Sequence, residues 1–313
     1  MTDERELLRQ TVAALVDKHA GSEAVRRAMD SPRGYDTALW TMLCEQVGVA
    51  ALVVPDEFGG AGGQLADAAA VLEELSRGLV PTPLLGTTLA ELALLSADTP
   101  DAETLEQLAS GAAIGTVVFD RDYVINGDVA DVVLAVDAGR IVRWSDVTVQ
   151  PVRTMDPTRR LARMTPGATL VIGPDPGIAD TAAILLAAEQ IGAAARCLEL
   201  TVEYTKQRVQ FGRPIGSFQA LKHRMADLYV AVQSARAVVV DAVAQPAPVS
   251  ARLARLAASE AFCMVAGEAI QLHGGIAITW EHDMHLYFKR AHGSAQLLGA
   301  PREQLRRLES EIL

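Results

Sequence analysis

The period of the hydrophobic pattern changes twice along this 313-residue chain, and that change constrains the fold more than any other feature. Between about residues 115 and 173, apolar residues form short β-branched runs such as GTVVF, VVLAV and ATLVIG, which are typical of strands. Turn signals separate these runs, among them Asn126-Gly127 and Asp137-Ala138-Gly139. On either side the apolar spacing is helical. We therefore predict a small antiparallel sheet or barrel between two helical regions.

The predicted fold class is mainly α with a small β domain. An N-terminal helical domain should cover residues 1–112, a reduced, short antiparallel β domain residues 113–175, and a C-terminal four-helix bundle residues 176–313. In the bundle, long helical segments with short connections favour antiparallel neighbours. These segments are residues 178–208, 217–243 and 250–274, with Ser217 expected as an N-cap.

The composition of the chain argues against several classes of binding partner. Its 28 basic and 39 acidic residues give a net charge of −11, which argues against general binding to nucleic acid or to an anionic membrane. No apolar run approaches the roughly 20 residues that span a bilayer, and the first ten residues lack the apolar stretch of a signal peptide. Three scattered cysteines fit a reducing compartment. We expect a cytoplasmic protein.

Two polar or flexible segments invite functional interpretations. The glycine-rich residues 53–63 contain no phosphate-loop motif, so a tight turn before the next helix is favoured over a nucleotide site. His282, Asp283 and His285 could suggest a metal, but they lack partner ligands at the usual spacing. Polar capping at the start of a helix is the better interpretation, and no metal site is predicted.

Two long stretches carry a family resemblance. RVQFGRPIGSFQALKHRMADL (208–228) and EAIQLHGGIAITWEHDMHLYFKRA (268–291) resemble the most recognisable parts of the flavin-dependent acyl-CoA dehydrogenases. VPDEFGGAGGQLADAAAVLEELSRG (54–78) supports the likeness, which covers nearly the whole chain. It implies the same three-unit fold, FAD as cofactor and an acyl-CoA substrate. An electron-transferring flavoprotein is the family's usual electron acceptor.

The resemblance also implies which residues contact the cofactor. In the family these positions touch FAD that is bound mainly by a neighbouring subunit. A guanidinium suits a pyrophosphate because it donates paired, charge-assisted hydrogen bonds, and paired glycines let backbone approach a ligand closely. A solvated helix-end cation and a simple helix C-cap are the alternatives for the arginine and the glycines. The implied residues are Arg208, Phe211, Gln219, Gln271, Leu272, His273, Gly274 and Gly275.

The catalytic base expected from the family is missing. Acyl-CoA dehydrogenases use a carboxylate to remove the α-proton of the thioester, often from an EGTxQ phrase, whose nearest likeness here is HGSAQ at 292–296. Other members place it early in the first bundle helix, where this chain has Ala182 and Ala183. Glu189, two turns on, is the remaining candidate base, and a polar contact inside the bundle is its alternative role. Asp180 and Glu281 are weaker candidates.

The family's own flavin cradle, a TEPGAGS-like phrase, is also missing from residues 115–133. A chain that keeps the residues donated to a neighbour but lacks its own cradle and base resembles the non-catalytic partner in actinobacterial α₂β₂ steroid-degrading acyl-CoA dehydrogenases. The implied partner is a paralogous catalytic subunit. Two alternatives stay open: a self-sufficient homomeric enzyme that uses Glu189, and a non-enzymatic scaffold of the same fold.

Overall fold

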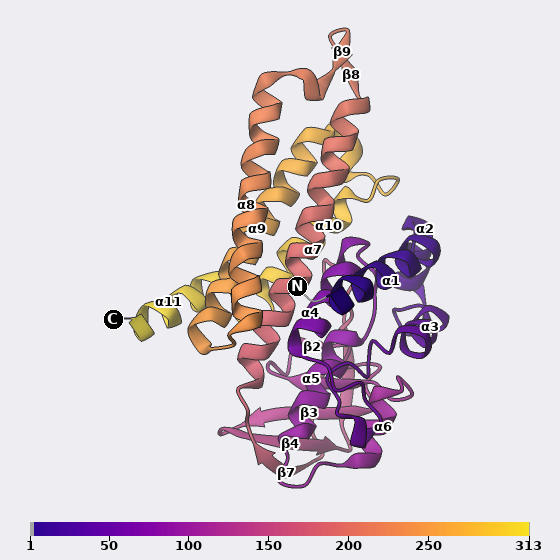
Figure 1. Ribbon diagram of the computed structural model, residues 1–313, viewed down its shortest axis with the longest axis vertical. Coiled ribbons are helices and arrows are strands. Elements are labelled where there is room, and N and C mark those ends of the chain that lie inside the picture. Colours follow the sequence, from indigo (N-terminus) through magenta and orange to yellow (C-terminus); the bar gives the residue numbers. More distant parts are fainter. Residues whose placement is uncertain (1–2, 313) are drawn as a thin grey trace.

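The computed structural model describes residues 3–312, and its first unit is helical (Figure 1). In α4, Val71, Leu72 and Leu75 are buried at the predicted helical spacing, and the glycine-rich segment before it forms the expected turn. The helices of this unit are α1 (Asp3–His19), α2 (Ser22–Asp30), α3 (Thr37–Val47), α4 (Leu65–Arg77), α5 (Leu84–Leu95) and α6 (Ala102–Ala109).

The β region consists of two small sheets packed face to face. Side chains such as Val133, Trp144 and Met164 fill the space between them. One sheet has the order β1-β3-β4-β7 and the other β2-β6-β5. The strands are β1 (Gly115–Val118), β2 (Val124–Ile125), β3 (Val132–Asp137), β4 (Arg140–Ser145), β5 (Thr148–Val152), β6 (Leu161–Thr165) and β7 (Ala168–Pro174).

Two details of the β prediction were wrong. The sheets are not wholly antiparallel, since β1 pairs with β3 in parallel. The chain between them crosses to the other sheet as β2, so it returns in the same direction. For the same reason Asn126-Gly127 joins no hairpin, because β2 pairs with β6. The turn at Ala138-Gly139 is confirmed: both residues have positive φ, 46° and 74°, as a two-residue hairpin loop between β3 and β4 requires.

The C-terminal unit is an antiparallel bundle (Figure 1). Its second helix begins after Phe218 and not after the predicted Ser217, whose hydroxyl instead donates to the carbonyl oxygen of Pro214. The elements are α7 (Ile178–Gln207), the hairpin β8 (Val209–Gln210) and β9 (Arg213–Pro214), α8 (Gln219–Ala244), α9 (Pro248–His273), the short helix η3 (Gly274–Ile278), α10 (Met284–Gln296) and α11 (Pro301–Ile312).

Small residues let α7 pack closely on its neighbours, which fits a chain in which only 4% of the residues are aromatic. At Gly192, a Cβ atom would overlap the backbone carbonyl of Glu73 on α4. Two helical segments, Ile178–Gln207 and Pro248–Ile278, are long and apolar enough to span a membrane by length and composition. The expectation that no segment reaches that length was therefore wrong. In α7, 83% of the apolar window is buried within the protein, as in the core helix of a bundle, and in Pro248–Ile278 the buried share is 44%.

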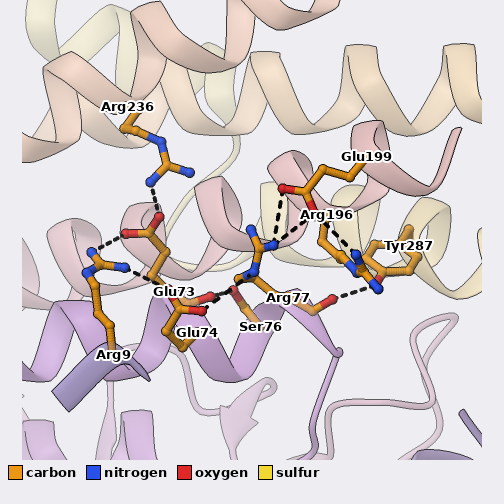
Figure 2. A network of polar contacts seen from close by, with 9 residues as sticks. All are labelled: Arg9, Glu73, Glu74, Ser76, Arg77, Arg196, Glu199, Arg236 and Tyr287. Carbon is orange, nitrogen blue, oxygen red and sulfur yellow. Dashed lines mark hydrogen bonds and ion pairs between the residues drawn. The ribbon is translucent and has the colours of Figure 1, made fainter. Parts of the chain in front are cut away.

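A chain of ion pairs joins the N-terminal helices to the bundle (Figure 2). Glu73 on α4 accepts from Arg9 on α1 at 2.6 Å and also pairs with Arg236 on α8. One turn on, Arg77 pairs with Glu199 on α7 at 2.8 Å. These contacts, together with the α4–α7 packing, fix the orientation of the first unit relative to the bundle.

Candidate functional site

The exposed members of the predicted cofactor set gather at one end of the bundle. Arg208 ends α7, Gln219 begins α8 and Gln271 lies in the last turn of α9, all three exposed. The antiparallel order brings these helix ends together, at the top of the view in Figure 1. Tyr204 links the ends of α7 and α9, because its hydroxyl donates to the carbonyl oxygen of His273 at 3.2 Å.

The β8–β9 hairpin projects Phe211 into solvent. Phe211 and Gly212 have φ of 54° and 75°, so they form a tight two-residue turn, and the ring of Phe211 is 93% exposed. Beneath it, the guanidinium of Arg213 lies 4.0 Å from the ring centre of Phe218. An apolar ring held out in this way is costly to hydrate and suits contact with a ligand or partner.

The QLHGG segment separates into two kinds of residue. Gln271, Gly274 and Gly275 are exposed, and nothing lies within 4 Å of where a Cβ of either glycine would stand, so their backbone is open to a ligand. Leu272 and His273 are buried. The His273 ring stacks on Tyr204 at 4.2 Å and its Nδ1 bonds the carbonyl oxygen of Ala269. These two buried side chains therefore anchor the segment in the protein, and they do not face a ligand.

This set of residues fits one side of a dinucleotide. It offers a guanidinium, two amides and open backbone N–H groups, which can donate hydrogen bonds to a pyrophosphate, and an aromatic face on which an adenine ring could stack. Gln219 also bonds His223 at 2.7 Å, which holds its amide at the helix start. We name Arg208, Phe211, Gln219, Gln271, Gly274 and Gly275 the clamp residues.

A large cleft lies at the opposite end of α7. This cleft, of about 1110 Å³, is bounded by the β domain, the first turns of α7 and the link from α10 to α11. Ala183, one of the two positions where the family resemblance placed a base, lines it, while Ala182 is fully buried. Ala183 and Arg208 are 25 residues apart, which is roughly 37 Å along a straight helix. The clamp residues thus lie far from the chain's own cleft.

The other base candidates differ in surroundings. Asp180 lines the cleft, and burial raises its pKa although Arg252 opposes the shift. Glu281 is exposed in the segment after η3. The HGSAQ segment is helical, with Gly293 and Gln296 at the cleft wall, whereas the His292 ring lies against Phe288.

Glu189 is held in a buried ionic cluster. Its carboxylate accepts from Arg290 at 3.0 Å and pairs with Arg159. Burial alone would raise its pKa, but the two guanidiniums more than offset it and the pKa is lowered. A carboxylate with a lowered pKa and two buried partners is a weak proton acceptor. The geometry therefore favours the alternative role, a polar contact inside the bundle.

Two family models match the chain and together span most of it. The N-terminal domain of acyl-CoA dehydrogenases matches residues 2–112, and the C-terminal domain matches residues 179–311. The chain belongs to the acyl-CoA dehydrogenase family. The resemblance and the fold class predicted from the sequence are both confirmed. Acyl-CoA dehydrogenases are FAD-dependent flavoproteins, so family membership also supports an oxidoreductase class and the cofactor prediction.

Close relatives of this acyl-CoA dehydrogenase share its length. It is 71% identical to acyl-CoA dehydrogenase IpdE2 of Mycobacterium tuberculosis, over 99% of this chain and 98% of the relative. Among solved structures, the Tcur3481-Tcur3483 steroid ACAD matches with a TM-score of 0.92 and 26% identity, covering 99% of this chain and 98% of that chain. The ChsE4-ChsE5 complex from Mycobacterium tuberculosis matches with a TM-score of 0.90 and 26% identity, covering 100% and 98%.

The histidines near the clamp of this acyl-CoA dehydrogenase have packing and capping roles. His282 Nδ1 accepts from the backbone N–H of Met284 at 3.2 Å, which confirms the predicted capping at the start of α10. Asp283 pairs with Arg26 at 2.6 Å, and His285 packs edge-on against Trp280. Within residues 3–312, no group of three or more His, Cys, Asp or Glu side chains is arranged to hold a metal.

Sequence reasoning missed the arginines at and behind the cleft. Arg121, Arg159 and Arg252 line it from three separate segments, and no sequence spacing relates them. One signal was available for the buried cluster behind the wall. Arg255 recurs at helical spacing with the apolar residues Ala251, Ala258 and Phe262, so a charge on the buried stripe of α9 was readable.

Proposed function

We propose that this chain is the partner subunit of a heteromeric acyl-CoA dehydrogenase and donates its clamp residues to FAD held mainly by a paralogous catalytic subunit. One observation carries the proposal. The clamp residues are exposed together at one end of α7, whereas the chain's own cleft lies at the other end with Ala183 at its wall. A chain arranged in this way serves a neighbour's cofactor better than its own.

Five of the clamp residues have a definable task in holding the cofactor. Arg208 would donate charge-assisted hydrogen bonds to the pyrophosphate, and Phe211 would cover an aromatic face of the cofactor. Gln271 and the open backbone of Gly274 and Gly275 would supply further donors. When bound, FAD supplies the two-electron acceptor for α,β-dehydrogenation of an acyl-CoA thioester. The α-proton would go to a carboxylate of the catalytic subunit, since Ala183 cannot accept it.

The substrate class and the electron acceptor are further parts of the proposal. The Tcur3481-Tcur3483 protein, which matches this chain over nearly its full length, is a steroid ACAD. That likeness supports a bulky, steroid-derived acyl-CoA for the assembled enzyme, by analogy of fold. An electron-transferring flavoprotein would take the electrons.

The test is flavin retention by the co-purified heteromer. The chain is expressed with its partner, and the flavin absorbance per heteromer is compared for the native chain and for the double variant Arg208→Ala, Gln271→Ala. We expect the double variant to lose most of its flavin while the subunits still co-purify. Arg163→Ala, at an exposed site on β6 in the β region, is the matched control and should retain flavin.

Three results would contradict the proposal. Unchanged flavin in the double variant would show that the clamp residues do not hold it. A yellow, active protein from this chain alone would favour a self-sufficient enzyme. An assembly without flavin under any condition would favour a scaffold.

A further inference from the structure

The lining of the cleft in this chain is suited to a ligand, although the catalytic base is missing there. Its walls are largely apolar, and two large side chains at its opening, Tyr123 and Met155, are about half exposed, at 51% and 52%. Phe119 and Leu161 continue the apolar lining inward. The cleft volume of about 1110 Å³ slightly exceeds the roughly 300–1,000 Å³ that is usual for small-molecule sites. The space suits a bulky apolar body.

The lining as a whole is balanced in charge, with four carboxylates and four guanidiniums: Asp120, Asp156, Asp180 and Glu303, and Arg121, Arg159, Arg252 and Arg307. The excess of positive charge lies in the buried ionic cluster at and behind the inner wall. Arg159 lines the cleft, is 9% exposed, and its Nη1 has no hydrogen-bond partner among the described residues. Behind the wall, Arg255 donates to the carbonyl oxygen of Leu297 at 3.0 Å. Three buried guanidiniums there, of Arg159, Arg255 and Arg290, face two carboxylates, of Glu189 and Asp156.

Arg255 explains why this excess is not neutralised. Its hydrogen-bond partners in the described residues are neutral oxygens of Gln190, Ser259, Ser294 and Leu297. These include carbonyls at the end of α10, whose dipole offsets only part of a full charge. A buried cation without a countercharge is costly, and an anion in the adjacent cleft would lower that cost.

We propose that this cleft binds a free organic acid with a bulky apolar body, its carboxylate directed to the inner wall at Arg159, without flavin and without a catalytic partner. The acid would be held unchanged, because Ala183 supplies no base and the wall no flavin cradle. The site lies at the far end of α7 from the clamp residues and goes beyond the proposed function. Its test reads ligand binding and not flavin content, so either idea can fail alone.

The experiment is a calorimetric titration of the flavin-free full chain with cholate, a rigid polycyclic carboxylate, and with its neutral methyl ester. We expect saturable binding of one cholate per chain, with the ester roughly tenfold weaker or more, since a hydrogen bond to a charged group is worth about 1.5–3 kcal/mol. Met155→Asp places a like charge at the opening and should weaken cholate binding by a similar factor. Ala183→Phe places a ring in the cleft at its α7 wall and should weaken cholate binding further.

Two controls keep the test decisive. Val230→Asp introduces the same charge at a comparably exposed site on α8, away from the cleft, and should leave cholate binding unchanged. Met155 is a surface position, so its variant remains informative if Ala183→Phe fails to fold. The proposal is overturned if cholate does not bind saturably, if the ester binds as tightly as the acid, or if Met155→Asp and Val230→Asp behave alike.

Discussion

The carboxylate of Glu189 on α7 and the guanidinium of Arg290 on α10 meet at 3.0 Å inside the bundle, where both side chains are about nine-tenths buried. Arg159 pairs with the same carboxylate from the β-domain side. Three segments of the chain that are far apart in sequence, two from the bundle and one from the β region, are therefore joined at one carboxylate. The residue that sequence reasoning offered as a base is the centre of a structural junction.

Replacing Glu189 by Gln should destabilise the fold by about 3–5 kcal/mol, because two buried guanidiniums lose their countercharge. Urea denaturation measures this loss. Glu199→Gln on the same helix removes a half-exposed ion pair and should cost less than about 1 kcal/mol. A Glu189→Gln enzyme of native stability but without acyl-CoA oxidation would instead identify Glu189 as the base.

The lowered pKa of Glu189 adds a pH signature. A carboxyl whose folded pKa lies below its unfolded value, about 4.3, stabilises the fold above that value and loses the contribution as pH falls through the folded pKa. The native chain should therefore lose more stability on acidification below about pH 4.3 than Glu189→Gln does. Thermal melts across that interval test the difference.

Gly192 and Gly267 make a matched pair within long helices. Gly192→Ala should destabilise by about 1–3 kcal/mol, because the new Cβ overlaps the Glu73 carbonyl and separates α4 from α7. Gly267→Ala meets nothing within 4 Å and should stabilise the isolated chain by about 0.5–1 kcal/mol. Melting temperatures of the two variants test this difference. Equal shifts would mean that the close α4–α7 contact at Gly192 contributes little to the stability of the fold.

Much of the fold was predictable because its signals are local. The long helix from residue 178 follows from an uninterrupted apolar-and-alanine pattern that ends at the FGRPIG turn. The turn at Ala138-Gly139 likewise follows from its residues. Pairing in the β region was not predictable, since the parallel contact of β1 with β3 depends on where the two-residue strand β2 docks.

The site residues also differ in how far local sequence signals predict them. Arg208 and Gln271 stand in long motifs, so a family resemblance located them. The sequence did not predict that Leu272 and His273 point inward, because this orientation depends on the stacking of His273 on Tyr204 from another helix. The arginines that line the cleft could not be predicted as a group, because they come together only in the folded structure.

Glu91 should weaken the fold as pH rises. It is fully buried on α5, neither carboxyl oxygen has a hydrogen-bond partner among the described residues, and burial raises its pKa well above the ordinary value. Its cost to the fold is smallest below the unfolded pKa, about 4.3, where the carboxyl is neutral in both states, and that cost grows as pH rises towards the folded pKa. Glu91→Leu should raise the free energy of unfolding at pH 7 by about 1–3 kcal/mol. Glu103→Gln, at an exposed site on α6, should change it little, and a destabilised Glu91→Leu would point to an undetected partner.

His285 should make the fold sensitive to mild acid. Burial, with Lys289 and Arg26 nearby, lowers its pKa to about 4, and neither ring nitrogen has a hydrogen-bond partner among the described residues. The unfolded imidazole protonates near pH 6.5, so unfolding takes up a proton and stability falls as pH drops from about 6.5 towards 4. His285→Leu should flatten the decline of the melting temperature between pH 7 and 5, while His19→Gln should not. A remainder will persist, since burial also lowers the pKa of His273 and of His282. An unchanged slope in His285→Leu would mean that its ring finds water or a proton acceptor when charged, and that the contact with Trp280 is looser than the packing indicates.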